Sequence, residues 1–224
     1  SEFRYRPPIM DKNSLVAAIS QSGETADTLA AIREAKRQNA LTFGVVNVVG
    51  SSIAREVTAG IYNHAGPEIA VASTKAFISQ IVILTELALY LGIKHGLSGI
   101  EARAMAEDLM RLPHLCRKVL AKENEVRRIA RKYADKNNFL YLGRKFNWPT
   151  AMEGALKLKE ISYIHAEGYP AGEMKHGPIA LIDKNFPSIV LAFKDSVYEK
   201  IVSNLEEIRA RKGPVIAIAT EGDT

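Results

Sequence analysis

The chain has 224 residues, of which 47% are hydrophobic and 25% are charged, a composition typical of a soluble globular protein with one large or two small domains. These values exclude disordered, collagen-like and low-complexity chains. The net charge of +5 is mild and dispersed, so it favours anionic ligands without indicating nucleic acid, and the single cysteine, Cys116, excludes an internal disulfide framework.

Short apolar runs alternate with segments of helical periodicity along the whole chain. In order, we expect a strand at 15–19, a helix at 24–38, strands at 43–49 and 60–63, helices at 73–91, 98–120 and 123–134, a strand at 139–142, a helix from Pro149 to about 164, a strand at 188–193, a helix at 197–211 and a strand at 215–219. Short continuous strands between helices predict an α/β protein whose parallel sheets are covered by helices on both faces.

Two further burial predictions concern helices. The apolar stretch 76–91 contains Ser79, Gln80, Thr85 and Glu86, so we interpret it as a buried core helix and not as a membrane span. Cys116, on the following helix, is expected to be a small buried side chain.

The sequence contains a weak internal repeat. Shifting the chain by about 174 residues places residues 14–19 over 188–193, and the following helices and strands also coincide. The repeat predicts two copies of one α/β unit, which we assign to residues 1–120 and 121–224. Both sheets look incomplete at their outer ends, so we expect a segment of a larger protein or one completed by its neighbours.

A turn rich in hydroxyl groups joins the first strand to the first long helix. Ser20, Gln21 and Ser22 precede Gly23, and Thr25 falls in the first helical turn. A helix N-terminus offers free N–H groups and a positive dipole end, and the side chains add donors, so the turn is a candidate phosphate site. The alternative is that Ser22 is an ordinary helix N-cap. The second copy's turn, residues 194–199, lacks the glycine and most of the hydroxyls, so only the first copy is expected to bind an anion.

A second helix start, at Val71–Lys75, also carries hydroxyl groups, including that of Ser73. By itself it is most simply a helix cap. It is of interest because loops at the carboxyl ends of strands in one open sheet converge on the same ligand site.

Acid–base chemistry is suggested by Glu153, Lys157 and Glu160, whose spacing places them on one helical face. The alternative is a surface Glu–Lys pair. The surrounding residues are small and apolar, which favours altered proton affinities. A Gly- and Pro-rich stretch, 168–178, is predicted to be an irregular loop that carries His176 as a proton-transfer residue, although an exposed loop histidine is the simpler reading. The spacing of the histidines predicts no metal site.

The motifs resemble those of one family. Residues 20–28 resemble the phosphate loop of sugar-isomerase (SIS) domains. Residues 65–77, 153–167 and 172–178 are similar to the isomerase part of the glucosamine-6-phosphate synthase family, whose members are also called glutamine–fructose-6-phosphate aminotransferases (isomerizing). The resemblance covers essentially the whole chain.

The resemblance implies two tandem flavodoxin-like SIS domains in a homodimer, with fructose 6-phosphate as substrate, glucosamine 6-phosphate as product, and ammonia from a separate glutaminase domain. It implies no cofactor and no metal. By motif, Ser20, Gln21, Ser22 and Thr25 hold the phosphate, and Val71 (through its backbone) and Ser73 contact the sugar. Likewise by motif, Glu160 moves a proton between C1 and C2, Lys157 assists at the sugar oxygens, and His176 opens the ring, reaching the neighbouring subunit's site.

The sequence also departs from this family. Its glutaminase domain, its first strand with a Gly-Thr-Ser turn, and its C-terminal tail with a Schiff-base lysine have no counterpart here, so we expect weak or no activity from these residues alone. Three alternatives stay open: a non-catalytic SIS module that senses a sugar phosphate, another SIS phosphosugar isomerase or deglycase, and a structural α/β interaction domain. No secretion signal is visible, and with the lone cysteine this favours a cytoplasmic protein that binds neither nucleic acid nor membrane.

Overall fold

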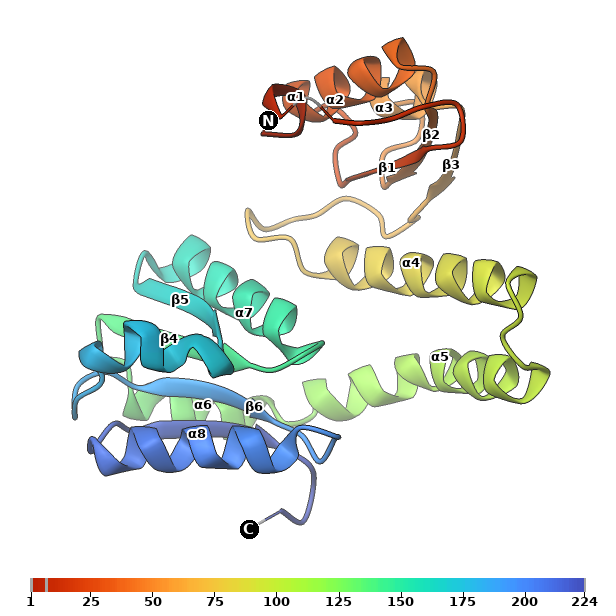
Figure 1. Cartoon of the computed structure of the whole chain (residues 1–224). Helices are drawn as coiled ribbons and strands as arrows, with labels where there is room; N and C mark the ends of the chain where they lie inside the picture. Colours follow the sequence, from red (N-terminus) through yellow and green to blue (C-terminus); the bar gives the residue numbers. More distant parts are fainter. Residues whose placement is uncertain (1, 7, 224) are drawn as a thin grey trace. The chain divides into compact units, whose positions relative to one another are not determined.

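The strands of this protein form two separate parallel sheets (Figure 1). The structure, a computed structural model, describes residues 2–6 and 8–223, and these divide into two units, Ser1–Arg117 and Lys118–Thr224, with one sheet in each. Every strand pair is parallel and helices pack on the sheets. The predicted α/β class, with parallel sheets flanked by helices, is therefore confirmed.

The first unit is built on three strands in the order β1-β2-β3. Its elements are α1 (Glu2–Tyr5), β1 (Leu15–Ser20), α2 (Ala26–Arg37), β2 (Leu41–Val46), α3 (Ser52–Glu56), β3 (Ala59–Tyr62), α4 (Lys75–Lys94) and most of α5 (Gly99–Leu120), whose last residues, from Lys118, fall in the second unit. The core joins Ala18 and Val46 of the sheet to Ile32 of α2 and Ile53 of α3. Both connecting helices thus cover the same face of the sheet. The turn between β1 and α2 follows Ser20, so it lies at the carboxyl ends of the parallel strands.

The two burial predictions for helices are wrong. Of the apolar helix α4 only Ala76 and Ile83 are buried, and Cys116 of α5 is exposed. An apolar composition indicates that a helix tends to pack against other apolar surface, but it does not show which element that surface belongs to. The helix α4 is long and apolar enough to cross a membrane. Length and hydropathy alone are weak evidence for a membrane span, because core helices of soluble proteins meet the same criteria.

The second unit has four strands in the order β5-β4-β6-β7. Its elements are α6 (Glu123–Lys132), β4 (Asn138–Gly143), α7 (Asn147–Ser162), β5 (His165–Pro170), the 3₁₀ helices η1 (Ala171–His176) and η2 (Pro178–Leu181), β6 (Ser188–Ala192), α8 (Tyr198–Ala210) and β7 (Val215–Ala219). Counted within the unit, the strands lie in the order 2-1-3-4, which is the order of flavodoxin-like folds.

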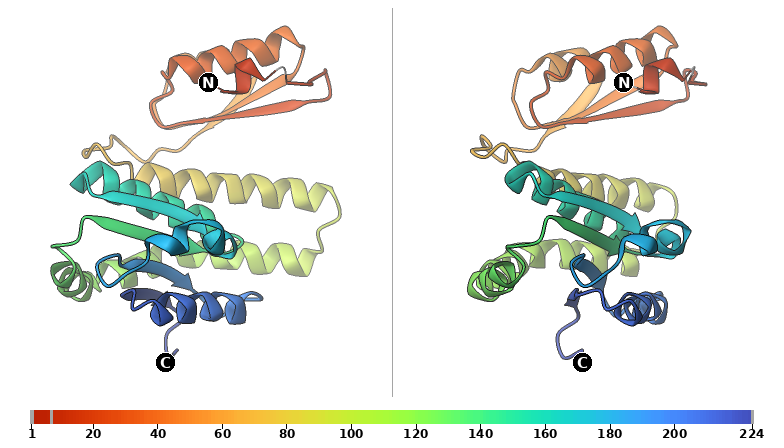
Figure 2. Two further views of the ribbon diagram at one scale, coloured as in Figure 1. Left: turned by 60° about the vertical axis from the view of Figure 1, so that its left-hand side comes forward. Right: turned by 90° about the vertical axis from the view of Figure 1, so that its left-hand side faces the viewer.

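Helices α7 and α8 cover opposite faces of this second sheet (Figures 1 and 2). Successive residues of β4 explain why, because side chains of a strand alternate between faces. Leu140 and Leu142 join the core beneath α8, whereas Phe139 joins Ala155 of α7 on the other side. The sheet therefore separates whatever is carried on α7 from whatever packs beneath α8.

The internal repeat corresponds to a repeated structural unit. The segments β1–α2–β2 and β6–α8–β7 are both strand–helix–strand units with adjacent parallel strands. Strand β2 begins at Leu41 and β7 at Val215, an offset of 174 residues that matches the offset in sequence. The pattern thus predicted this connectivity correctly.

The prediction of an irregular loop at 168–178 is wrong. Its first residues complete β5, which the sequence did not indicate, and the others form η1 and η2. Strand β5 is an edge strand, where a proline at the end, Pro170, removes no ladder hydrogen bond that the sheet needs. Gly168 is there because α7 crosses β5 so closely that an added Cβ would lie 2.4 Å from the Cα of Met152.

This close crossing predicts that Gly168→Ala destabilises the protein by about 1–3 kcal/mol, since backbone of α7 must move to admit one methyl group. Gly172→Ala is the matched control, because its nearest neighbour would be the Arg144 guanidinium at an ordinary 3.5 Å. Urea unfolding of the two variants measures the difference. Equal stability would mean that α7 and β5 are less tightly packed than described.

Candidate functional site

The turn after β1 is a compact loop held by its own hydroxyl groups. Ser20 Oγ accepts a hydrogen bond from the Gly23 N–H at 3.0 Å, and Ser22 Oγ accepts one from the Glu24 N–H at 3.2 Å. In both bonds the hydroxyl is the acceptor, so its own hydrogen remains available to donate to an anion. We call residues 20–25 the phosphate turn.

Thr25, and not Ser22, is the N-cap of α2. The simple explanation of Ser22 as a helix cap is therefore wrong. The Thr25 hydroxyl makes no capping hydrogen bond to the N-terminal N–H groups of α2. Neither the hydroxyl nor these N–H groups are therefore engaged in a side-chain cap. Gln21 contributes its backbone carbonyl to the fold, because it accepts a hydrogen bond from the Asn47 N–H at 3.3 Å.

Gly23 is the residue that permits this shape. Its φ is +69°, and a Cβ added to it would lie 2.0 Å from Ser51 Oγ. Ser51 is buried and its Oγ has no hydrogen-bond partner among the described residues. The phosphate turn is thus pressed directly against the segment that follows β2.

Glu24 adds a further link to that segment. One oxygen of its carboxylate, Oε1, accepts a hydrogen bond from the Ser52 N–H at 2.8 Å, at the start of α3. Hydrogen bonds from Ser52 lower the pKa of Glu24, so this group stays charged and helps to fix the turn.

The loop between β3 and α4, residues 63–74, carries the predicted sugar contacts. Val71 is almost fully exposed, and the Ser73 hydroxyl donates to Glu68 Oε1 at 3.1 Å. The same oxygen accepts from the backbone N–H groups of Thr74 and Ala76, at 3.1 and 2.8 Å. These bonds, led by that from Ala76, lower the pKa of Glu68. Glu68 therefore caps α4 and sets the position of Ser73, a role that the sequence did not reveal.

Helix α7 brings the predicted acid–base residues together. Lys157 Nζ lies 2.6 Å from Glu160 Oε2 and 3.3 Å from Glu153 Oε1. The three side chains are only 22–31% exposed, so they are not a freely solvated surface pair. Partial burial lowers the pKa of Lys157, but the hydrogen bonds and charges of the two glutamates raise it more, and the net shift is upward. Lys157 therefore keeps its proton at neutral pH.

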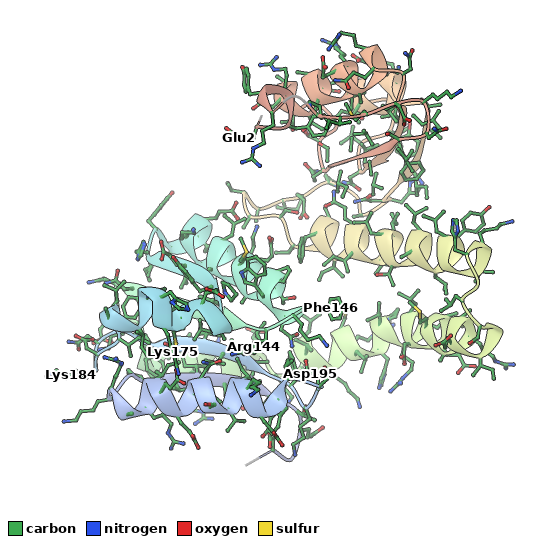
Figure 3. All side chains as sticks on the ribbon, viewed as in Figure 1. Glu2, Arg144, Phe146, Lys175, Lys184 and Asp195 are labelled. Atoms are coloured by element: carbon green, nitrogen blue, oxygen red, sulfur yellow. The ribbon has the colours of Figure 1, made fainter. Side chains whose placement is uncertain are left out.

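His176 does not join this group. It ends η1, its side chain is 75% exposed, and its ionic neighbour among the described residues is Glu173, at 4.0 Å. The preceding residues are fixed between the sheet and α8, because Met174 is buried in that core and Lys175 Nζ lies 2.9 Å from Glu207 Oε1 of α8 (Figure 3). The structure thus packs the segment of His176 on the face of the sheet opposite to α7.

The predicted residues therefore divide between the two units. Ser20, Gln21, Ser22 and Thr25 with the Ser73 loop belong to the first unit, whereas Lys157, Glu160 and, apart from them, His176 belong to the second. Among residues 2–6 and 8–223, no group of three or more acidic, histidine or cysteine side chains could hold a metal ion.

The profile of the SIS domain matches residues 1–90 and 132–224, which include most of α4. The chain is 56% identical, over its whole length, to the glutamine–fructose-6-phosphate aminotransferases (isomerizing) of Chlorobaculum tepidum and Thermus thermophilus, and it spans 36% and 37% of their lengths. A solved structure, the C-terminal domain of glucosamine-fructose-6-phosphate aminotransferase from Francisella tularensis, is 43% identical, with a TM-score of 0.95 over 98% of this chain and 63% of that one. The chain therefore belongs to the SIS domain family.

Proposed function

We propose that this chain is the sugar-isomerase part of a glutamine–fructose-6-phosphate aminotransferase (isomerizing), with two SIS domains at residues 1–120 and 121–224, bounds close to those of the structural units Ser1–Arg117 and Lys118–Thr224. The protein would convert fructose 6-phosphate and ammonia to glucosamine 6-phosphate and water, a step of amino-sugar biosynthesis. The observation that carries the proposal is the half-buried Glu160–Lys157 pair, 2.6 Å apart, in a chain similar over its full length to such enzymes.

The reaction needs a base that carries a proton between neighbouring carbons. Ammonia condenses with the C2 carbonyl of the sugar and releases water, after which a proton leaves C1 and returns to C2. A carboxylate that lies within hydrogen-bond reach of both carbons can take up this proton and return it. Glu160 fits the role of the base, and Lys157, which holds its proton, fits that of an acid at the sugar oxygens.

Substrate recognition falls to the first unit. A phosphate needs several converging donors, and the phosphate turn offers the hydroxyls of Ser20, Ser22 and Thr25, the Gln21 amide and the N-terminus of α2. The backbone of Val71 and the hydroxyl of Ser73 would contact the sugar. No metal or cofactor is needed for this set of roles.

His176 is assigned to ring opening by motif, and the packing of its segment on the α8 side of the sheet supports action outside its own chain. Since the sheet separates its segment from α7, one chain's His176 would serve the site of a second copy. We therefore propose a homodimer. The glutaminase domain of the longer protein would be the partner that supplies ammonia, and a cytoplasmic location would suit the lone cysteine.

The half-buried acid–base pair also bears on the alternatives. A sugar-phosphate sensor or a purely structural module does not require a carboxylate and a lysine held 2.6 Å apart in a partly desolvated place. Such a pair is the feature that favours an enzyme over both. Another SIS isomerase or deglycase is disfavoured by the similarity over all 223 aligned residues to an aminotransferase.

Calorimetric titration with fructose 6-phosphate tests the proposal, with unphosphorylated fructose as the control. We expect binding of the phosphate ester alone. Binding of neither sugar by the folded protein, or equal binding of both, would contradict a phosphate-dependent site.

Ser22→Ala is expected to weaken the binding of fructose 6-phosphate by about 1–3 kcal/mol, because a hydroxyl donor to a charged oxygen is lost. The helix should be unaffected, since Thr25 is its N-cap. Titration of the variant measures the binding loss, and circular dichroism checks the helix. An unchanged affinity would remove Ser22 from the phosphate site.

A further inference from the structure

The phosphate turn and the loop that carries Ser73 are joined through one buried residue, Asn47. It follows β2, the central strand of the first sheet, and is 8% exposed. Its backbone N–H donates to the Gln21 carbonyl of the phosphate turn at 3.3 Å. Its position at the carboxyl end of β2 places it beside the end of β1, where ligands of open parallel sheets bind.

The side chain of Asn47 holds the other segment. Its Nδ2 donates to the Gly66 carbonyl at 2.7 Å, and its Oδ1 accepts from the Ala65 N–H at 2.9 Å. Both ends of the amide are therefore engaged with two successive residues of the loop that leads to Val71 and Ser73. An amide is required at this point, because the loop presents one acceptor and one donor together.

The phosphate turn itself is held to the segment after β2 at further points. The Ile53 N–H donates to the Gly23 carbonyl at 2.9 Å, and the Ser52 N–H donates to Glu24 at 2.8 Å. Loss of the Asn47 side chain would leave these two bonds and the backbone bond to Gln21 in place. The turn should therefore keep its shape while the 63–74 loop loses its attachment.

We propose that Asn47 is a positioning residue that fixes the sugar-contact loop relative to the phosphate turn, so that a bound phosphate places the sugar against Val71 and Ser73. This inference rests on the proposed function, because it uses the assignment of the two segments to phosphate and sugar. Asn47 itself does not contact the substrate, and it acts through the loop.

The test compares two ligands on the complete enzyme that contains this chain. Inorganic phosphate, measured as a competitor of fructose 6-phosphate, reports the phosphate turn alone, whereas fructose 6-phosphate reports turn and loop together. Asn47→Asp has the same size but, when ionised, cannot donate to the Gly66 carbonyl. We expect its inhibition constant for phosphate to stay within about twofold, and its KM for fructose 6-phosphate to rise about tenfold or more with a smaller change in kcat, because one tenfold step corresponds to one buried hydrogen bond.

The matched control is Thr42→Val. Thr42 lies near the start of β2, at the end opposite to Asn47, and its buried hydroxyl group is hydrogen-bonded to the Thr58 hydroxyl at 3.2 Å. The substitution should lower the melting temperature and leave both ligand constants unchanged. If Asn47→Asp also lowers the melting temperature, Asn47→Ala, which buries no charge, is used in its place. The same two constants are then compared, the inhibition constant for phosphate and the KM for fructose 6-phosphate.

The outcomes separate the two proposals. Equal weakening of phosphate and fructose 6-phosphate, or no weakening of either, in a wild-type enzyme that binds both, overturns the role of Asn47 alone. A wild-type enzyme that binds neither ligand overturns the proposed function and this inference with it.

Discussion

Glu160→Gln, in the aminotransferase that we propose contains this chain, is expected to lower kcat for fructose 6-phosphate by about 10²–10⁴-fold, the usual contribution of a general base. The substitution keeps the shape of the side chain and removes the proton acceptor. Binding of the sugar phosphate should change little, since the phosphate turn and the 63–74 loop belong to the other structural unit. Steady-state kinetics and a separate calorimetric titration measure the two effects.

Glu153→Gln provides the matched control for this experiment. Glu153 also lies close to Lys157, at 3.3 Å, on the same helix, and its side chain is 22% exposed against 31% for Glu160. The substitution removes a negative charge from the surroundings of Lys157 and leaves the proposed base, Glu160, in place. We therefore expect less than a tenfold loss of kcat. Similar losses in the two variants would indicate that the glutamates act only by holding Lys157, and the assignment of Glu160 as base would be abandoned.

Both glutamate variants also act on Lys157. Each removes a group that raises its pKa, while the opposing effect of burial remains. Because the shift in the native protein is upward, the stabilisation from these pairs is fully present below the usual pKa of lysine and is lost as the pH rises through the raised value. The activity differences should therefore be measured near neutral pH, where Lys157 is charged in the native protein and its protonation does not confuse the comparison.

Patterns in the sequence predicted correctly those parts of the structure that depend on residues close together along the chain. The turn between β1 and α2, the Glu153–Lys157–Glu160 face and the strand–helix–strand repeat follow from periodicity and spacing alone. Strand β5 was missed, because its glycine and its proline are tolerated only at a sheet edge crossed closely by α7, and that crossing depends on tertiary structure.

The predicted site had a similar limit. Sequence reasoning named Ser73 but not Glu68, which accepts its hydrogen bond, and it named the phosphate turn but not Asn47, which pairs with residues 18 and 19 positions away. Asn47 did carry one usable signal, a polar side chain at the carboxyl end of a buried strand. The separation of His176 from Glu160 carried none, because it depends on which face of the sheet η1 packs against.

Gly23→Ala is expected to disrupt the phosphate turn more than any other single methyl group. The added Cβ would lie 2.0 Å from Ser51 Oγ and 2.5 Å from its Cβ, and the φ of +69° disfavours any side chain. Overpacking costs about 1–3 kcal/mol and the left-handed conformation about 1–2 kcal/mol. Since the residue lies within the turn, we expect the combined cost to appear as at least a 30-fold loss of affinity for fructose 6-phosphate, measured by titration.

Two further variants divide this effect into its causes. Gly50→Ala also has a positive φ, +73°, but no atom lies within 4 Å of its added Cβ, so it measures conformational strain in the adjoining segment without a clash. The double variant Gly23→Ala, Ser51→Gly removes the clash and keeps the strain, and it should recover most of the lost affinity. If the double variant binds no better than Gly23→Ala, the contact with Ser51 is not what shapes the turn, and the flexibility of residue 23 alone must account for its binding geometry.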